Sequence, residues 1–142
     1  MNNLTRSAGR YLSKLSNKIR RQLDSFSFKG AFSGAQGKVL HFLLAQNEDV
    51  FQKDIEEEYS LRPSTATELL KQMEKSGLIT REAVPYDKRL KKIILTEKAI
   101  SYKEQVIKDL TDLEEKITKD IPKEDLETCF NVLEKMLDNL SE

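Results

Sequence analysis

The sequence predicts a mainly α-helical protein that carries one small β-hairpin. Apolar residues recur at helical spacing near both ends of the chain and in three shorter segments between residues 33 and 76. Gly77 is followed by two short runs rich in branched residues, 78–84 and 90–95, joined by a turn around PYDKR. A length of 142 residues, with 38% hydrophobic and 34% charged content, suits one helical domain with solvated faces or with apolar surface hidden in an oligomer.

The first helix is expected from Leu4 to Phe26, where apolar residues share one face. Its opposite face is basic and consists of Arg6, Arg10, Lys14, Lys18, Arg20 and Arg21. We interpret this basic face as solvated, or as a partner for the acidic C-terminal third, rather than as a site for a polyanion. After a glycine-marked loop, Ser33 is placed to cap a second helix that ends at Asn47-Glu48-Asp49.

A short third helix is expected at FQKDIEEEYS, with Asp49 near its start. Pro63 suits the first position of a fourth helix, where its missing N–H costs nothing. Gly77 should end that helix as a C-terminal glycine cap. The apolar face of the fourth helix consists of Ala66, Leu69, Leu70 and Met73. Two short helices joined by a tight turn and followed by a hairpin predict a winged helix-turn-helix.

Two amphipathic helices complete the chain, a long one capped by Thr96 and a last one opened by Pro122. Their apolar stripes consist of Ile100, Val106, Ile107, Leu110, Leu113 and Ile117 in the first, and Leu126, Cys129, Phe130, Leu133, Met136, Leu137 and Leu140 in the second. Soluble monomers avoid exposing such stripes, so we infer a homodimer. The single domain 1–142 is thus expected to hold a winged helix-turn-helix lobe at 33–95 and dimerisation helices at 1–30 and 97–142.

Charge is unevenly distributed along a chain whose formal net charge is zero. Residues 62–95 hold 8 basic and 4 acidic side chains, whereas residues 96–142 hold 7 basic and 13 acidic ones. A basic middle beside an acidic C-terminal third indicates one surface that faces a polyanion.

Three stretches resemble the MarR/SlyA-type transcriptional regulators across nearly the full length of the chain. They are QGKVLHFL, QKDIEEEYSLRPSTATELLKQMEKSGLITRE and DKRLKKIILTEKA. Ala99 departs from the glycine usual in that family, which a helix start should tolerate. The resemblance implies a homodimer that binds double-stranded DNA at a pseudo-palindromic site, in most members as a repressor. It also implies a small-molecule effector between the dimerisation helices and the DNA-binding lobe.

The start of the fourth helix supplies the candidates for DNA contact. Short polar side chains at the N-terminus of a helix can reach base edges in a major groove. The candidates are Arg62, Ser64, Thr65, Thr67, Glu68 and Lys71, with Gln52 and Lys53 at the start of the third helix as candidates for a phosphate. Glu68 either accepts from cytosine or orients Arg62. The alternative interpretation is a capping box formed by Thr65 and Glu68, which needs no DNA.

The hairpin, or wing, supplies a second set of candidates. Arg89 suits the negative potential of a narrow minor groove. Lys88, Lys91 and Lys92 would pair with phosphates and add affinity that depends on salt. Asp87 is expected to structure the wing by accepting backbone N–H bonds or by pairing with Arg81 or Arg89. The alternative is a basic hairpin that only protects a sheet edge.

Other sites have weaker support. Tyr11, His41 and Phe42 are candidates to line an effector crevice, although no polar constellation names the ligand. Cys129 lies on an apolar stripe, so we expect a buried and inert thiol rather than a redox sensor. One histidine and one cysteine far apart make a zinc site improbable, and no metal or cofactor is expected.

The leading interpretation is therefore a sequence-specific transcription regulator. An alternative is a winged-helix adaptor that binds proteins and not specific DNA. Enzymatic activity is not expected, because the sequence lacks a glycine-rich phosphate loop and a nucleophile with a base. No apolar run approaches the roughly 18 residues of a membrane span. The stretch MNNLTRSAGRYL lacks the apolar core of a signal peptide, so the default expectation is a cytoplasmic protein.

Overall fold

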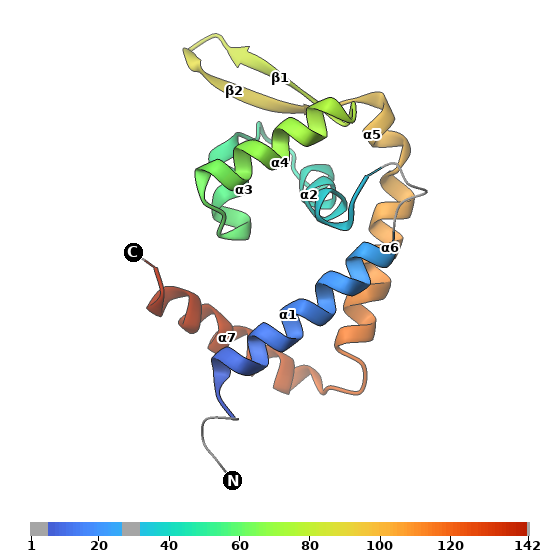
Figure 1. Cartoon of the computed structure of the whole chain (residues 1–142), viewed down its shortest axis with the longest axis vertical. Helices are drawn as coiled ribbons and strands as arrows, with labels where there is room; N and C mark the ends of the chain where they lie inside the picture. The colour runs from blue at the N-terminus through green and yellow to red at the C-terminus, as the bar shows by residue number, and fades with distance from the viewer. Residues whose placement is uncertain (1–5, 27–31, 142) are drawn as a thin grey trace. The chain divides into compact units, whose positions relative to one another are not determined.

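The computed structural model describes residues 6–26 and 32–141 (Figure 1). Helices dominate, and one antiparallel hairpin of two strands lies between the fourth and fifth helices. The elements in chain order are α1 (Ala8–Ser25), α2 (Gly34–Leu44), α3 (Gln52–Tyr59), α4 (Pro63–Lys75), β1 (Ile79–Val84), β2 (Asp87–Leu95), α5 (Glu97–Ser101), α6 (Lys103–Ile117) and α7 (Lys123–Asn139). The predicted fold class, a winged helix-turn-helix with long helices at both ends, is confirmed.

The chain divides into two compact units, Met1–Leu110 and Thr111–Glu142, and α6 runs from the first into the second. The first unit holds the winged helix-turn-helix lobe, and the second holds the end of α6 and all of α7. None of the helices in the described ranges is long and apolar enough to cross a membrane.

Ser33 starts α2 as predicted. Its hydroxyl accepts a hydrogen bond from the backbone of Gln36 at 3.2 Å, and the Gln36 side chain accepts one from the Ser33 backbone at 3.4 Å. This reciprocal pair is a capping box. The helix that follows is shorter than expected, because it ends at Leu44 rather than at Asn47-Glu48-Asp49. A Cβ added to Gly34 would overlap the backbone carbonyl of Leu23, so glycine permits α1 and α2 to meet closely.

The helix-turn-helix is formed by α3 and α4. Asp49 was expected near the start of α3, but Phe51 is the N-cap, and its N–H donates to the Asp54 carboxylate at 2.9 Å. Pro63 is the first residue of α4, as predicted. Of the predicted apolar face of α4, Ala66, Leu70 and Met73 are buried and Leu69 is half-buried.

One junction joins α4, the hairpin and α5. Gly77 follows α4 with a φ of 75°, a left-handed conformation that glycine adopts without a steric penalty. The Thr96 hydroxyl donates to the Gly77 carbonyl at 2.6 Å, and it accepts from the Ala99 backbone at 3.1 Å as the N-cap of α5. The Lys98 ammonium donates to the Ser76 carbonyl at 2.8 Å. Ala99 is completely buried here, so the alanine fits.

The hairpin carries a register shift near its turn. Pairing is regular from Ile79 opposite Leu95 to Ala83 opposite Lys91, and Val84 then pairs with Asp87. Three residues of β2, Lys88 to Leu90, consequently have no counterpart on β1. The strand β2 begins at Asp87, earlier than the predicted residue 90. An isolated bridge between Val50 and Ile93 ties the segment before α3 to the hairpin.

The predicted long helix after Thr96 is interrupted. It is divided at Tyr102 into α5 and α6, and the Tyr102 ring packs edge-on against Phe32 at 5.0 Å. Tyr102 is the C-cap of α5, with a φ of −92° and a ψ of 0°. Of the predicted stripe, Val106 and Leu113 are buried, whereas Ile100 and Ile107 are exposed.

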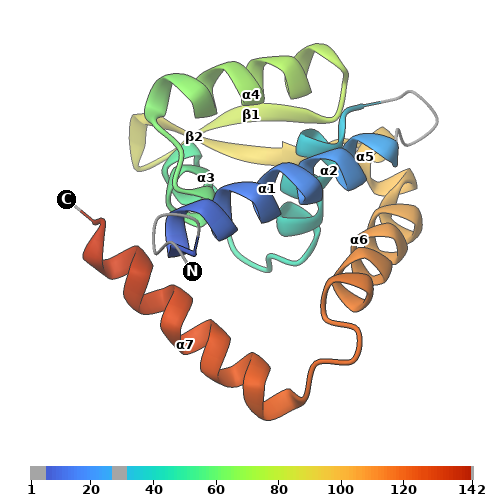
Figure 2. The same cartoon turned by 60° about the horizontal axis from the view of Figure 1, so that its bottom comes forward.

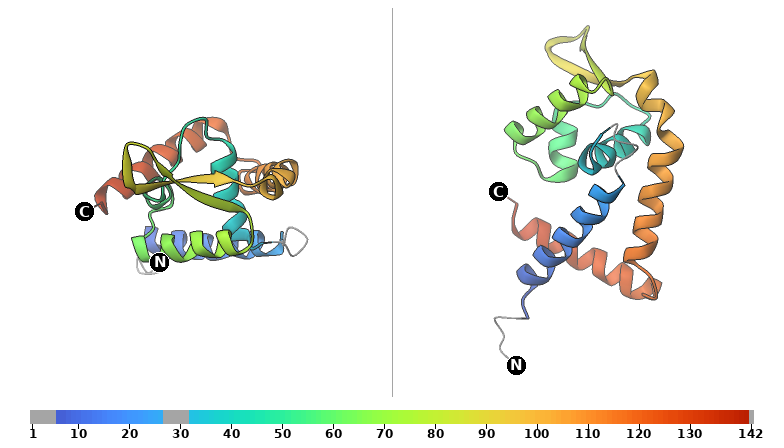
Figure 3. Two further views of the ribbon diagram at one scale, coloured as in Figure 1. Left: turned by 90° about the horizontal axis from the view of Figure 1, so that it is seen from above. Right: turned by 45° about the vertical axis from the view of Figure 1, so that its right-hand side comes forward.

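The core lies between α2, α3, α4, the hairpin and the start of α6. Its largest fully buried side chains are Val39, Leu40, Ile55, Leu70, Met73, Leu78, Ile79 and Val106. Figure 3 shows α4 lying against the hairpin. In α7, by contrast, Phe130, Leu137 and Leu140 are exposed. Cys129, expected to be buried on the apolar stripe, is exposed in the single chain.

The contact at Gly34 gives the first prediction. Gly34→Ala should lower the free energy of unfolding by about 1–3 kcal/mol, because the new methyl group must displace the Leu23 backbone. Urea unfolding followed by circular dichroism measures this change. Gly9→Ala is the matched control, since a Cβ at Gly9 meets nothing within 4 Å. Equal stability of the two variants would contradict the close approach of α1 to α2.

Candidate nucleic-acid interface

The N-terminus of α4 is open and polar. No side chain caps it, and its N-cap residue is Arg62. The unpaired N–H groups of a helix start favour a negatively charged group. Arg62, Ser64, Thr65, Glu68 and Lys71 are all exposed, and we call these five residues the α4 surface. The alternative capping box is wrong, because Thr65 is the third residue inside the helix and cannot be its N-cap.

Thr67 differs from the α4 surface. Its side chain is half-buried, and its hydroxyl accepts a hydrogen bond from Gln52 Nε2 at 2.9 Å. Gln52 also donates to Glu56 at 3.2 Å and to the Pro63 carbonyl at 3.3 Å. The two side chains predicted to meet DNA independently are therefore bonded to each other. Lys53, the neighbour of Gln52, is exposed.

Two of the four basic residues of the wing, Lys88 and Arg89, lie on its register shift. Lys88, Arg89 and Lys91 are exposed, and 90% of the Arg89 side chain is accessible. Lys92, on the paired part of β2 opposite Glu82, is half-buried. Positive charge is thus presented mainly where β2 has no counterpart on β1. Leu90, which the sequence did not indicate as a surface residue, is also exposed there.

Asp87 organises the end of the wing. Its carboxylate accepts from the Arg89 backbone at 2.9 Å and from the Arg89 guanidinium through two contacts of 3.3 Å. These bonds from Arg89, first from its side chain and then from its backbone, lower the pKa of Asp87. Of the partners predicted for Asp87, Arg89 is thus the one that the structure places beside it.

Arg81 lies at the base of the wing instead. Its Nε is 3.2 Å from the Glu74 carboxylate, an ion pair whose alignment is not that of a hydrogen bond. Its Nη1 donates to Gln52 Oε1 at 3.4 Å. Glu74 was missed in the sequence, because seven residues and the Gly77 turn separate it from Arg81 and no local pattern pairs them. Arg81 thus connects β1 to α3 and α4.

The candidate residues face one end of the lobe. In Figures 1 and 2 the turn of the hairpin and the N-terminal end of α4 lie at the same end of the first unit. An uncapped helix start and a basic strand segment are therefore presented together. Both features attract phosphate groups, and the side chains between them can form hydrogen bonds.

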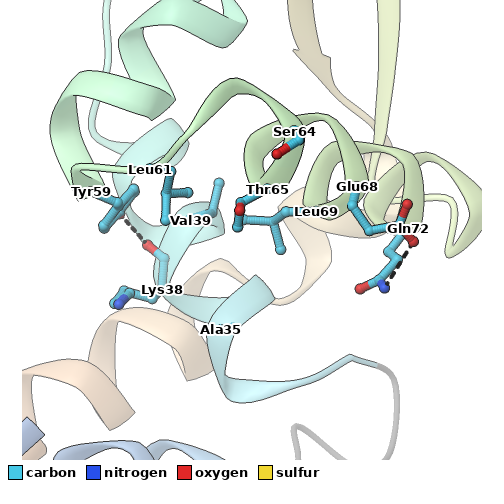
Figure 4. Close-up of a pocket in the computed structure, with 10 residues that line it drawn as sticks. All are labelled: Ala35, Lys38, Val39, Tyr59, Leu61, Ser64, Thr65, Glu68, Leu69 and Gln72. Carbon is cyan, nitrogen blue, oxygen red and sulfur yellow. Dashed lines mark hydrogen bonds between the residues drawn. The ribbon is translucent and has the colours of Figure 1, made fainter.

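A hollow of about 550 Å³ lies beside this end, between α2 and α4 (Figure 4). Val39, Leu61 and Leu69 give it an apolar floor, and Ser64, Thr65 and Glu68 of the α4 surface form part of its wall. The Tyr59 hydroxyl donates to the Lys38 carbonyl at 2.9 Å at one end. Burial, and to a smaller degree the charge of Glu58, raises the pKa of Tyr59.

The three residues expected at an effector site lie elsewhere. Tyr11 is exposed on α1, while His41 and Phe42 are half-buried on α2. Phe42 packs edge-on against Tyr59, with ring centroids 6.1 Å apart. The hollow in Figure 4 is lined by other residues. Across the described ranges, no group of three or more histidine, cysteine, aspartate or glutamate side chains is arranged to hold a metal ion.

Comparison with known sequences gives one family match. A family model described as MarR family matches residues 32–90, which span α2, α3, α4, β1 and the first part of β2. Comparison with curated protein sequences gives no significant match.

Solved structures match over more of the chain. The S. aureus MepR–DNA complex has a TM-score of 0.87 and 24% identity, and covers 99% of this chain and 100% of that one. A MarR family regulator from Listeria monocytogenes, complexed with 26mer DNA, has a TM-score of 0.83 and 17% identity, covering 94% and 89%. The transcription regulator MarR from Oenococcus oeni PSU-1 has a TM-score of 0.83 and 30% identity, covering 93% and 99%. On these matches, the chain belongs to the MarR family of transcription regulators.

Proposed function

We propose that this protein is a homodimeric transcription regulator that binds a pseudo-palindromic site in double-stranded DNA and acts as a repressor. One observation carries the proposal. The exposed basic segment of the wing and the uncapped start of α4 lie at the same end of one lobe. The S. aureus and Listeria monocytogenes proteins of the same fold were solved with DNA, which supports DNA as the partner.

The two parts of the interface have different roles in this proposal. The α4 surface enters a major groove, where Ser64, Thr65 and Glu68 reach base edges and Arg62 and Lys71 reach phosphates. Arg89, whose side chain is 90% exposed on the unpaired segment of β2, enters the adjacent minor groove. Lys88 and Lys91 bind phosphates on either side of Arg89 and contribute affinity without sequence preference.

Dimerisation is proposed for the regions 1–30 and 97–142, which flank the lobe at 33–95. On α1, Tyr11, Leu12 and Leu15 are exposed, and on α7 Leu137 and Leu140 are 59% and 85% exposed. Burying these apolar side chains against a second copy would remove them from water. Two lobes related by a two-fold axis would then read two half-sites roughly 34 Å apart.

The last part of the proposal is that a small-molecule effector releases the protein from DNA. Tyr11, His41 and Phe42 remain the proposed contacts of an effector. His41 and Phe42 lie on α2, the helix on which the C-terminal end of α1 packs at Gly34. An effector that displaces α1 from α2 would change the relation between the proposed dimerisation region and the lobe that carries α4. Such coupling requires the effector to bind the two arrangements with different affinities.

The role of the wing gives the second prediction. Arg89→Ala should weaken binding to the selected DNA site by about 1–3 kcal/mol and reduce the salt slope by about 1. Fluorescence anisotropy at several salt concentrations measures both quantities. Lys119→Ala, at an exposed lysine in the proposed dimerisation region, controls for the loss of one charge and should leave the slope unchanged. Unchanged affinity and slope for Arg89→Ala would remove the wing from the interface.

The third prediction concerns the dimer. Leu137→Glu should convert a dimer into a monomer of 16.4 kDa, because the new carboxylate would be buried without a partner. Sedimentation velocity gives the mass directly. Lys135→Glu, an exposed position on the same helix, introduces a carboxylate without removing apolar contact area and should leave the dimer intact. A wild-type protein that sediments as a monomer would refute this part of the proposal.

Selection of bound sequences from a random duplex pool, at two salt concentrations, tests the function as a whole. A two-fold-symmetric consensus is the expected result. Retention without a consensus would refute sequence-specific regulation, and failure to retain DNA at low salt would favour a protein-binding adaptor.

A further inference from the structure

We propose that Gln52 orients the Thr67 hydroxyl so that this hydroxyl donates its hydrogen to an acceptor atom on DNA. In this way α4 recognises a hydrogen-bond acceptor at the position that Thr67 contacts. The acceptor is an oxygen or nitrogen on a base edge, or a phosphate oxygen. Gln52 is then a positioning residue that acts through Thr67. This inference rests on the proposed function, because it requires α4 to face DNA.

The orientation of the Gln52 amide is fixed by partners that can only donate, or can only accept, a hydrogen bond. The Arg81 guanidinium only donates, so the Gln52 atom 3.4 Å from its Nη1 must be the oxygen. The Pro63 carbonyl and the Glu56 carboxylate only accept, so the atom 3.3 Å and 3.2 Å from them must be the nitrogen. Partners on three elements, α3, α4 and β1, therefore agree on one orientation.

This orientation determines what Thr67 can do. The Gln52 nitrogen carries two hydrogens and cannot accept. Its three acceptors share these two hydrogens, and Thr67 Oγ1 is the nearest of them at 2.9 Å. The Thr67 oxygen must therefore accept, and its own proton is directed away from Gln52. A helical threonine often donates to the carbonyl four residues earlier. Here that carbonyl belongs to Pro63. It accepts from Gln52 and, as the residue four before Thr67 in α4, from the Thr67 backbone N–H, so both of its lone pairs are used.

The proton of Thr67 is thus available to an acceptor outside the protein. Thr67 is half-buried, and it lies one turn from Ser64 on the helix proposed to enter the major groove. Acceptors in that groove are N7 and O6 of guanine, N7 of adenine and O4 of thymine. The amino groups of adenine and cytosine are donors and cannot pair with a hydroxyl held in this way.

Arg81 extends the arrangement to the base of the wing. Its Nε lies 3.2 Å from Glu74, so the guanidinium that holds the Gln52 oxygen is itself held between β1 and the C-terminal half of α4. Only 19% of the Arg81 side chain is exposed, which limits competition from water. Contacts within the protein alone therefore decide that the Thr67 hydroxyl accepts from Gln52 and is left to donate its proton elsewhere.

Four variants test the proposal against the site that the wild-type protein selects from a random duplex pool. Thr67→Val and Gln52→Met, which keep approximate shape and remove the hydrogen bonds, should each weaken binding about 3- to 10-fold. The double variant should bind no more weakly than either single variant, because both lose the same contact. Thr67→Ser keeps the hydroxyl and should select the same consensus as the wild-type protein. Thermal melting checks that each variant is folded.

The source of the acceptor is identified by substitutions in the DNA. Replacing a purine by its 7-deaza analogue removes N7. Replacing guanine by 2-aminopurine removes O6, and replacing thymine by 5-methyl-2-pyrimidinone removes O4. A methylphosphonate removes a charged phosphate oxygen. One of these changes should weaken the wild-type complex and leave the Thr67→Val complex unaffected. The pair Gln52→Glu with Glu56→Gln keeps the total charge and makes residue 52 an acceptor. It should bind the Thr67 proton and shift selection toward an adenine or cytosine amino group.

Each contrary outcome has a defined meaning. Additive losses in Thr67→Val and Gln52→Met, or an unchanged consensus in the charge-exchanged pair, would overturn the role of Gln52. Full affinity of Thr67→Val beside a weakened Arg89→Ala would overturn this inference and leave the proposed function intact. If the wild-type protein retains no DNA at either salt concentration, both the inference and the proposed function fail.

Discussion

The junction around Gly77 and Thr96 is the contact on which the rest of the lobe depends. Gly77 turns the chain from α4 into β1, and the Thr96 hydroxyl, nineteen residues later, bonds to the Gly77 carbonyl while it caps α5. The same few atoms therefore end one helix, close the base of the hairpin and start the next helix. A hairpin of two strands is marginal by itself, so its fixed position beside α4 depends on this joint and on the apolar contacts below it.

Much of the fold could be predicted, because its boundaries depend on local chemistry. Ser33, Pro63, Gly77 and Thr96 each mark an element end through interactions with residues close in sequence, and the structure confirms each one. The break at Tyr102 could not be predicted. The local pattern there favours an uninterrupted helix, and the aromatic contact that Tyr102 makes is with Phe32, seventy residues away. Cys129 is exposed in the single chain, because an apolar stripe does not indicate what covers it.

The candidate site was predictable to a similar degree. Exposed residues such as Arg62 and Arg89 could be identified because their charge and their place in the motif suffice. Gln52 and Thr67 could be identified as candidates, but their hydrogen bond to each other could not be predicted. Their bond spans fifteen residues and depends on how α3 crosses α4. Composition indicates that a surface is polar, whereas tertiary contacts decide which of its polar groups already have hydrogen-bond partners within the protein.

The register shift in the wing separates the length of the hairpin from the register of its paired base, two properties that are normally linked. From Ile79 to Ala83 the strands are locked in register by their pairing and by the core beneath them. Beyond Ala83, three residues of β2 have no counterpart. Residues gained or lost in that segment would lengthen or shorten the wing without moving the paired base, since no cross-strand partner would change. The length of the wing is therefore free to diverge among relatives, or to be redesigned, while the lobe that carries it stays the same.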